Sequence, residues 1–138
     1  MNKKDLEQRT KRFALQVIDF CDALPRARSS EVLAKQLIRS ATSIGANYRE
    51  ANRAESRKDF IHKIAIVEKE AAETEYWLEL IVERVSADNT EVRPILQESR
   101  EILAIFTAIG RSTKERGDQI REDDEDVGFR ISDFEFRI

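Results

Sequence analysis

Hydrophobic residues recur at spacings of three, four and seven along most of this chain, which is the period of an amphipathic α-helix. Polar breaks divide the pattern into four segments, so four helices are predicted. Pro25 is expected to end the first helix, and Ser29 or Ser30 to cap the second. Gly117 is expected to end the fourth. The predicted helices cover about 4–24, 30–55, 58–86 and, after a break at 86–90, the segment up to 116.

The connections between these segments are short, and short connections make sequential helices antiparallel neighbours. The predicted fold class is therefore all-α: an antiparallel up-down-up-down four-helix bundle over residues 1–116, followed by an extended acidic C-terminal tail over residues 117–138. The third segment is apolar on more than one side, because Ile66, Trp77 and Leu80 fall outside its main stripe. We expect another protomer to cover the second apolar side.

The C-terminal tail differs in composition from the helical segments. Residues 117–126 form an acidic linker, and apolar and polar residues alternate after it. The large apolar residues of the tail are Phe129, Ile131, Phe134, Phe136 and Ile138. Two interpretations are equally supported: the tail docks on a partner, as a strand at a sheet edge or in a groove, or it folds back on its own bundle.

Composition argues against a membrane-spanning protein and against a disulfide-stabilised one. Charged residues make up 37% of the chain, and no apolar run reaches the roughly 18 residues of a membrane span, so no membrane partner is expected. Cys21 is the single cysteine, which excludes an internal disulfide and fits a cytoplasmic location. The net charge of −3 is unevenly distributed: residues 1–69 hold 15 Lys and Arg against 9 Asp and Glu, a net +6, which leaves −9 for residues 70–138.

Charged and polar residues occupy positions on the second and third predicted helices where a core-facing stripe is expected. These residues are Arg39, Ser43, Asn47, Glu50, Lys63, Glu70, Glu73 and Thr74. If the turn lies near residue 57, antiparallel packing brings Glu50 opposite Lys63. The same register places Arg39 within reach of Glu70 or Glu73. We predict a buried polar network with a structural role, because a buried guanidinium needs carboxylate partners.

Two smaller expectations concern the second predicted helix. Ser43 and Asn47 would flank Glu70 and fill the remaining hydrogen-bonding positions of its carboxylate. Gly45 has small neighbours, so it is expected to let two helices approach closely and to offset in this way its helix cost of roughly 1 kcal/mol.

The acidic residues also allow a weaker alternative, a metal-dependent hydrolase that uses Glu70 and Glu73. Their spacing is similar to that of Mg-dependent all-helical nucleotide hydrolases. The single histidine, His62, belongs to no Glu-x-x-His pair of the ferritin-like kind. No glycine-rich phosphate loop is present. We therefore predict no enzymatic activity, no cofactor and no metal.

A cationic patch near the N-terminus is the candidate for nucleic-acid contact. Its members are Lys3, Lys4, Arg9, Lys11 and Arg12. Such a cluster can hold phosphate, but it is equally typical of a solvated helix face, because phosphate contact requires charge and no specific motif.

Motifs in the last three predicted helices carry a family resemblance. They are Arg39–Ala41, Ser43–Asn47, Arg49–Ala51, Phe60–Lys63, Lys69–Ala71, Glu73–Thr74, Tyr76–Leu80, Glu101–Leu103, Ile105–Phe106, Ile109 and Thr113–Lys114. With these residues the chain resembles, over about 4–116, the four-helix-bundle family of proteins encoded within intervening sequences of bacterial 23S rRNA genes. The resemblance implies an antiparallel bundle that assembles as a homopentamer and has no known enzymatic activity.

The resemblance also shapes the functional hypothesis. A more distant relative of that family, the accessory protein of diversity-generating retroelements, is a basic pentameric bundle that binds RNA and a reverse transcriptase. The acidic balance of this chain departs from that basic character. The favoured hypothesis is a non-enzymatic, cytoplasmic scaffold or accessory protein that binds copies of itself and RNA or an RNA-handling protein. The alternative is an interaction module that recruits a partner through the Phe/Ile tail.

Overall fold

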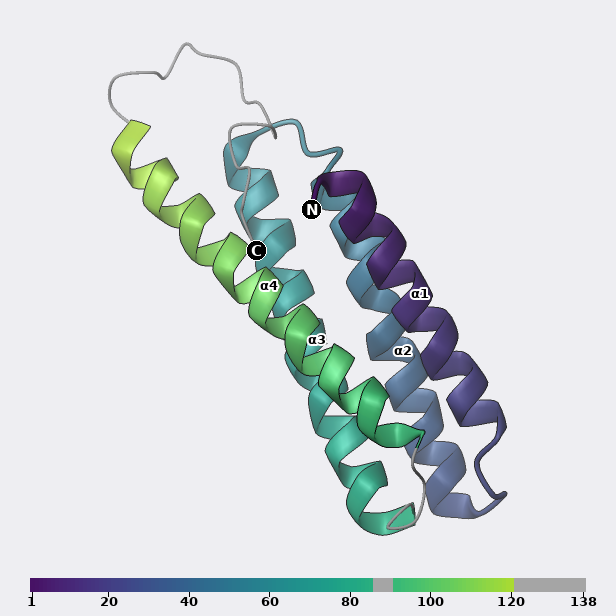
Figure 1. The fold of residues 1–138 in the computed structure, drawn as a ribbon. Helices are drawn as coiled ribbons and strands as arrows, with labels where there is room; N and C mark the ends of the chain where they lie inside the picture. The colour runs from purple at the N-terminus through teal and green to yellow at the C-terminus, as the bar shows by residue number, and fades with distance from the viewer. Residues whose placement is uncertain (86–90, 121–138) are drawn as a thin grey trace.

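The computed structural model describes residues 1–85 and 91–120. Its helices are α1 (Lys3–Asp22), α2 (Arg28–Ala51), α3 (Arg57–Val85) and α4 (Val92–Ile120). Each helix packs against the next one in sequence, and α1 also contacts α4. Figure 1 shows the helices alternating in direction along one long bundle, so the predicted all-α, up-down-up-down four-helix fold is confirmed. The predicted C-terminal tail lies mostly outside the described residues.

Local capping explains two of the helix starts. The side chain of Asn2 accepts a hydrogen bond from the backbone N–H of Asp5 (2.8 Å), and the Asn2 N–H donates to the Asp5 carboxylate (3.1 Å). This capping box satisfies two N–H groups that would otherwise lack partners at the start of α1. At the start of α3, the Ser56 hydroxyl accepts from the N–H of Asp59 (3.0 Å).

Two of the predicted helix limits are wrong. Neither Ser29 nor Ser30 caps α2, which begins at Arg28 after Ala27 in extended backbone without a side-chain cap. Ser30 is instead buried within the first turn. Gly117 does not end α4, which continues to Ile120. A single glycine costs a helix interior only about 1 kcal/mol, so it lowers helix stability without forcing an end.

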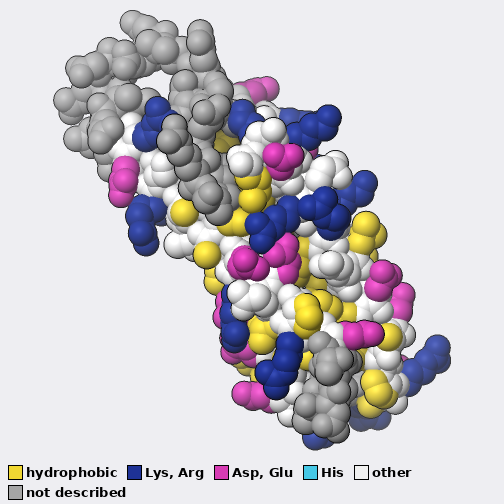
Figure 2. All heavy atoms as spheres, viewed as in Figure 1, with side chains coloured by type: hydrophobic (Ala, Val, Ile, Leu, Met, Phe, Trp, Pro, Cys, Tyr) yellow, Lys and Arg dark blue, Asp and Glu magenta, His cyan; other side chains and the backbone are white. Residues whose placement is uncertain are grey.

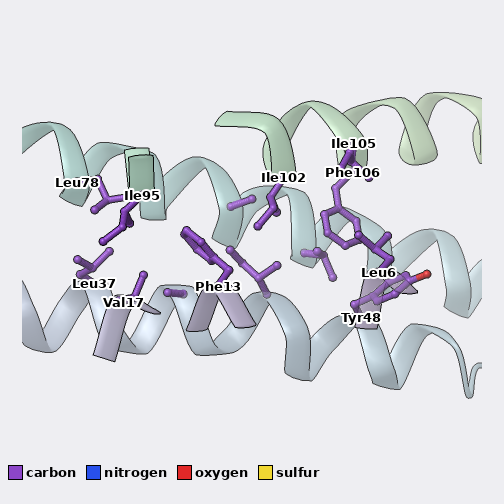
Figure 3. Packing of buried hydrophobic residues seen from close by; sticks show 14 of the residues in the cluster. Leu6, Phe13, Val17, Leu37, Tyr48, Leu78, Ile95, Ile102, Ile105 and Phe106 are labelled. Carbon is purple, nitrogen blue, oxygen red and sulfur yellow. The ribbon is translucent and has the colours of Figure 1, made fainter. Parts of the chain in front are cut away.

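The core is a continuous column of apolar side chains contributed by all four helices (Figure 3). Its largest fully buried members are Leu6, Phe13 and Val17 of α1, Leu37, Ile44 and Tyr48 of α2, Ile64, Leu78 and Ile81 of α3, and Ile102, Phe106 and Ile109 of α4. Tyr48 and Phe106 meet edge to face, with their ring centroids 5.1 Å apart. This geometry contributes about 0.5–1.5 kcal/mol beyond simple burial.

The broad apolar surface of α3 is only partly buried in the single chain. One part faces inward against both α2 and α4, and Trp77 packs at the edge of the core as a half-buried residue. Ile66 and Leu80, the other residues predicted outside the main stripe, are also half-buried in the single chain. Tyr76 is 54% exposed. In the described ranges no helix has both the length and the hydropathy to cross a membrane.

Candidate functional site

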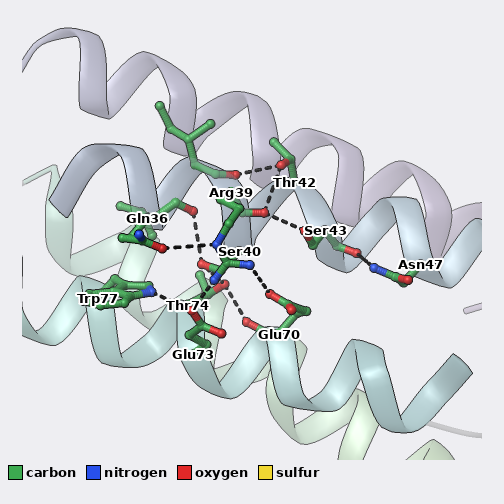
Figure 4. Close-up of polar contacts among 12 residues, drawn as sticks. Gln36, Arg39, Ser40, Thr42, Ser43, Asn47, Glu70, Glu73, Thr74 and Trp77 are labelled. Atoms are coloured by element: carbon green, nitrogen blue, oxygen red, sulfur yellow. Dashed lines mark hydrogen bonds and ion pairs between the residues drawn. The ribbon is translucent and has the colours of Figure 1, made fainter. Parts of the chain in front are cut away.

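The polar cluster predicted between the second and third helices forms around Arg39. Its guanidinium donates from Nη1 to Glu70 (3.1 Å), from Nη2 to Glu73, and from Nε to the side-chain oxygen of Gln36 (3.2 Å). The indole N–H of Trp77 donates to the same Glu73 carboxylate (3.2 Å). Figure 4 shows these groups side by side along the line where α2 meets α3. Arg39 was predicted to reach Glu70 or Glu73, and it pairs with both carboxylates.

A second ion pair extends this line toward the α2–α3 turn. Lys63 Nζ lies 3.1 Å from Glu50 Oε2, which matches the register expected from a turn near residue 57. Both pairs join α2 to α3 in the register that the sequence predicted.

The predicted roles of Ser43 and Asn47 are wrong. Ser43 donates to the backbone oxygen of Arg39 (2.7 Å), and Asn47 donates to the backbone oxygen of Ser43 (2.8 Å). Each side chain therefore bonds to its own helix one turn back and does not reach Glu70. Hydroxyl and amide groups on helices often return to the preceding turn, where an acceptor is always within reach.

Burial of the network is also not observed in the single chain. The side chain of Arg39 is 44% exposed and that of Glu50 is 59% exposed. These residues flank the α2 stripe formed by Leu37, Ala41 and Ile44 rather than lying within it. The ion pairs are therefore solvent-screened contacts at the edge of the core, each worth less than a buried pair would be.

A buried polar contact does exist, but one of its members was not predicted. Thr74 Oγ1 donates to Ser40 Oγ (2.9 Å), and Ser40 Oγ lies 3.2 Å from the backbone oxygen of Leu37. Ser40 and Thr74 are both fully buried. The signal for Ser40 was present in the sequence, since it lies three residues after Leu37 and four before Ile44, inside the apolar stripe.

The cationic patch on α1 is divided by the structure. Arg9 donates from Nε and Nη2 to the two carboxylate oxygens of Glu98 on α4, at 2.9 and 2.6 Å. Hydrogen bonding to Glu98 raises the pKa of Arg9, which stays charged and committed to this pair. Arg9 is therefore a link between the first and last helices and not the free phosphate contact that was predicted. Lys4, Lys11 and Arg12 remain exposed, and Lys3 is half-buried.

The arrangement does not favour hydrolysis at Glu70 and Glu73. Both carboxylates are engaged by Arg39, and residues 1–85 and 91–120 hold no group of three metal-binding side chains. His62 is exposed. The buried thiol of Cys21 has its pKa raised to about 11 by desolvation and by nearby Asp22, so it is not an activated nucleophile.

An exposed side of α3 is the other candidate site. Ile61, Ala65, Ala72, Tyr76 and Leu80 follow one another at spacings of four and seven, so they share one side of the helix. None of them belongs to the buried core. The ring of Tyr76 contacts that of Trp77 edge to face at 5.2 Å between centroids, which joins this side of α3 to the Arg39 cluster. We call these five residues the outer face of α3.

Comparison with known proteins assigns the chain to a family. The model of the 23S rRNA-intervening sequence protein family matches residues 2–108. The chain belongs to this family. The match includes α1, α2 and α3 whole and ends within α4, and it confirms the resemblance seen in the sequence motifs.

A solved relative has the same fold. The crystal structure of a protein with unknown function from the S23 ribosomal protein family of Bacteroides thetaiotaomicron is 38% identical, with a TM-score of 0.69. The alignment covers 77% of this chain and 98% of that chain. No curated protein matches the chain. The predicted docking residues Phe129, Ile131, Phe134, Phe136 and Ile138 lie outside the described residues.

Proposed function

We propose that the protein is a non-enzymatic helical-bundle scaffold that assembles with copies of itself and associates with RNA. The observation that carries the first part is the outer face of α3, where exposed Tyr76 shares one side of the helix with half-buried Ile61 and Leu80. Exposed aromatic and aliphatic groups on one helix side are typical of protein interfaces. The family resemblance gives a homopentamer as the expected assembly, and the single buried Cys21 fits a reducing cytoplasm.

Fewer cations of α1 are available to RNA than the sequence indicated. Arg9 is engaged by Glu98, which leaves exposed Lys4, Lys11 and Arg12 as the cations that α1 offers to phosphate. Lys4 and Lys11 are seven residues apart and lie on the same side of the helix. Contacts of this kind give affinity without base specificity, and their strength falls steeply with salt.

Self-assembly is tested by light scattering on the purified chain, wild type and variants. Tyr76→Glu places a charge on the outer face of α3 and is expected to yield a smaller species. Val32→Glu is the matched control, because Val32 of α2 is also an exposed apolar residue (58%) but lies on a different helix. It is expected to keep the wild-type mass. A monomeric wild type, or equal effects of both variants, would contradict assembly through this face.

RNA association is tested by fluorescence anisotropy with a single-stranded RNA oligonucleotide over a range of salt concentrations. Replacing Lys4, Lys11 and Arg12 by Gln is expected to weaken binding and to flatten its salt dependence, because fewer counterions are released. Replacing exposed Lys35, Lys69 and Arg93 by Gln removes as much charge elsewhere. No RNA binding at low salt, or the same loss in both triple variants, would show that α1 is not the contact.

A further inference from the structure

Charge is distributed unequally between the two ends of the bundle. Because the helices alternate in direction, the first turns of α1 and α3 lie at the same end as the last turns of α2 and α4 (Figure 1). We define the basic end as residues 3–8, 48–63 and 111–116. These ranges hold 10 Lys and Arg against 6 Asp and Glu, a net charge of +4.

The opposite end has the reverse balance. Residues 19–35, 75–84 and 91–101 hold 6 Lys and Arg against 9 Asp and Glu, a net charge of −3. The bundle is therefore electrically polar along its length, and a flexible anionic ligand would concentrate near one end.

The cations of the basic end are available to a ligand. Its exposed members are Lys4, Arg49, Arg53, Lys58, Arg111, Lys114 and Arg116. None of these seven takes part in an ion pair within the part of the chain that the structure describes. Figure 2 shows Lys and Arg side chains at the upper end of the visible face, where α1 begins. Unpaired like charges repel one another, so an anion bound among them would relieve that repulsion.

The chain itself carries an acidic segment shortly after the helix that ends at the basic end. Glu122–Asp126, which we call the acidic run, comprises five consecutive carboxylates and begins two residues after Ile120, where α4 ends. Residues 121–138 as a whole hold 7 Asp and Glu against 3 Arg, a net charge of −4. The acidic run lies outside the described residues, but the helix that leads to it ends at the basic end.

We propose that the acidic run docks on the basic end of its own bundle. The six residues from Ile120 to Asp126 can span at most about 20 Å, and the axes of packed helices lie about 8–10 Å apart. The run therefore reaches cations on more than one helix. Tethering also gives it an effective concentration of about the millimolar range, far above that of a separate ligand.

Docking has a consequence for nucleic acid. Lys4 belongs both to the basic end and to the cations that α1 offers to phosphate, so the acidic run and RNA would compete for it. This consequence, unlike docking itself, rests on the RNA association proposed above. The acidic run would then act as a built-in competitor that weakens RNA binding without any change of fold.

Docking is tested on the full chain by zero-length carbodiimide cross-linking, which joins carboxylates to lysine amines in contact. We expect links from the acidic run to Lys4, Lys58 or Lys114 at low salt, and their loss at about 0.5 M salt, where exposed charges are screened. An equal mixture of isotope-labelled and unlabelled protein separates links within one chain from links between copies. Links only between copies, only to Lys35 or Lys69, or none at all would overturn the proposal.

Competition is tested with a full-length variant in which the acidic run is neutralised, carrying Glu122→Gln, Asp123→Asn, Asp124→Asn, Glu125→Gln and Asp126→Asn. Its affinity for the RNA oligonucleotide at low salt is expected to rise by about tenfold or more. The control Asp133→Asn with Glu135→Gln, which removes tail charge outside the run, should change affinity much less. Equal affinities of wild type and neutralised variant would refute competition. If neither binds RNA, the RNA proposal fails, and the cross-links alone decide docking.

Discussion

At the scale of single residues, burial determines which polar contacts stabilise the bundle. Ser40 and Thr74 pair inside the core, whereas Arg39 and its carboxylates pair where solvent reaches the guanidinium. A buried hydroxyl that loses its partner keeps its full desolvation cost, but an exposed charge that loses its partner is rehydrated. The Arg39 cluster makes more hydrogen bonds than the Ser40–Thr74 pair. Because solvent reaches its charges, it should nevertheless contribute less stability than the number of those hydrogen bonds indicates.

Thr74→Val should destabilise the chain by about 1–2 kcal/mol, because the buried Ser40 hydroxyl loses its partner on α3. Adding Ser40→Ala should cost less in this background than in the wild type, since the two hydroxyls are coupled. Urea unfolding of the four proteins in this cycle measures the coupling. Strictly additive losses would mean that the two hydroxyls act independently.

Glu70→Ala should cost only about 0.5–1 kcal/mol, because Arg39 keeps Glu73 and remains open to water. The comparison is Glu83→Ala, an exposed α3 glutamate that makes no ion pair in the described ranges. Chemical denaturation in low and high salt distinguishes the two variants, since the excess loss in Glu70→Ala should shrink with salt. A loss of several kcal/mol would indicate that assembly buries the Arg39 cluster.

Stability should fall as the pH rises from about 9 to 12. Burial raises the pKa of Cys21 from 9.0 to about 11 and that of Tyr48 from 10.0 to about 12. The folded state holds both protons more tightly than the unfolded state. The stabilisation from each group is therefore complete below its unfolded pKa and is lost as the pH rises from there through its folded pKa. The loss is about 2–3 kcal/mol for each group. Urea midpoints of wild type, Cys21→Ala and Tyr48→Phe across this range test the assignment, and identical pH profiles would contradict it.

At the scale of helices, close approach depends on what faces each glycine. A Cβ on Gly45 would lie 3.1 Å from Thr10 Oγ1 on α1, and that hydroxyl is held by hydrogen bonds to the backbone of its own helix. A Cβ on Gly110 would meet the far end of the flexible Glu68 side chain at the same distance. Only the first contact is rigid, which confirms the expectation that Gly45 allows two helices to approach closely.

The two glycines should therefore respond to alanine with opposite signs. Gly45→Ala should destabilise by about 1 kcal/mol, because overpacking against Thr10 exceeds the gain in helix propensity. Gly110→Ala should stabilise by up to about 1 kcal/mol, since the Glu68 carboxylate can move aside. Thermal unfolding measures both. Adding Thr10→Ala should rescue Gly45→Ala, and failure of that rescue would show that the Thr10 contact is not the cause.

At the scale of the whole molecule, Arg9 of α1 links the first helix of the bundle to the last through ion pairs with Glu98 and Glu101. α1 packs mainly on α2. Arg9 makes a bidentate ion pair with Glu98 of α4, and both side chains are partly shielded from water. A planar guanidinium is suited to this geometry, whereas a lysine ammonium is not. The pair therefore helps to fix where α4 lies against α1.

Arg9→Met should lower stability by about 1–2 kcal/mol, because Glu98 loses both of its charge-assisted hydrogen bonds from Arg9. Arg9→Lys should recover only part of this loss, since lysine keeps the positive charge but lacks the planar guanidinium that donates two hydrogen bonds to one carboxylate. Lys11→Met, at an exposed α1 position, is the control. Thermal unfolding of the three variants provides the measurement, and equal midpoints for Arg9→Met and Lys11→Met would remove the structural role assigned to the pair.

The sequence by itself determined the four helices, their order and the register of α2 against α3. These features depend on local periodicity and on short connections, and both can be read without knowing the tertiary structure. Arg39 with Glu70 and Glu73, and Lys63 with Glu50, could be paired for the same reason.

Only the tertiary structure decided burial and partner choice. A helical period gives the direction of a side chain but not how far it lies from the centre of the core, so the Arg39 cluster was expected inside and Ser40 was overlooked. The pairing of Arg9 with Glu98 joins residues 89 positions apart, and no local pattern specifies such a contact. The packing of four helices also made one end of the bundle basic, because residues from separate segments meet there.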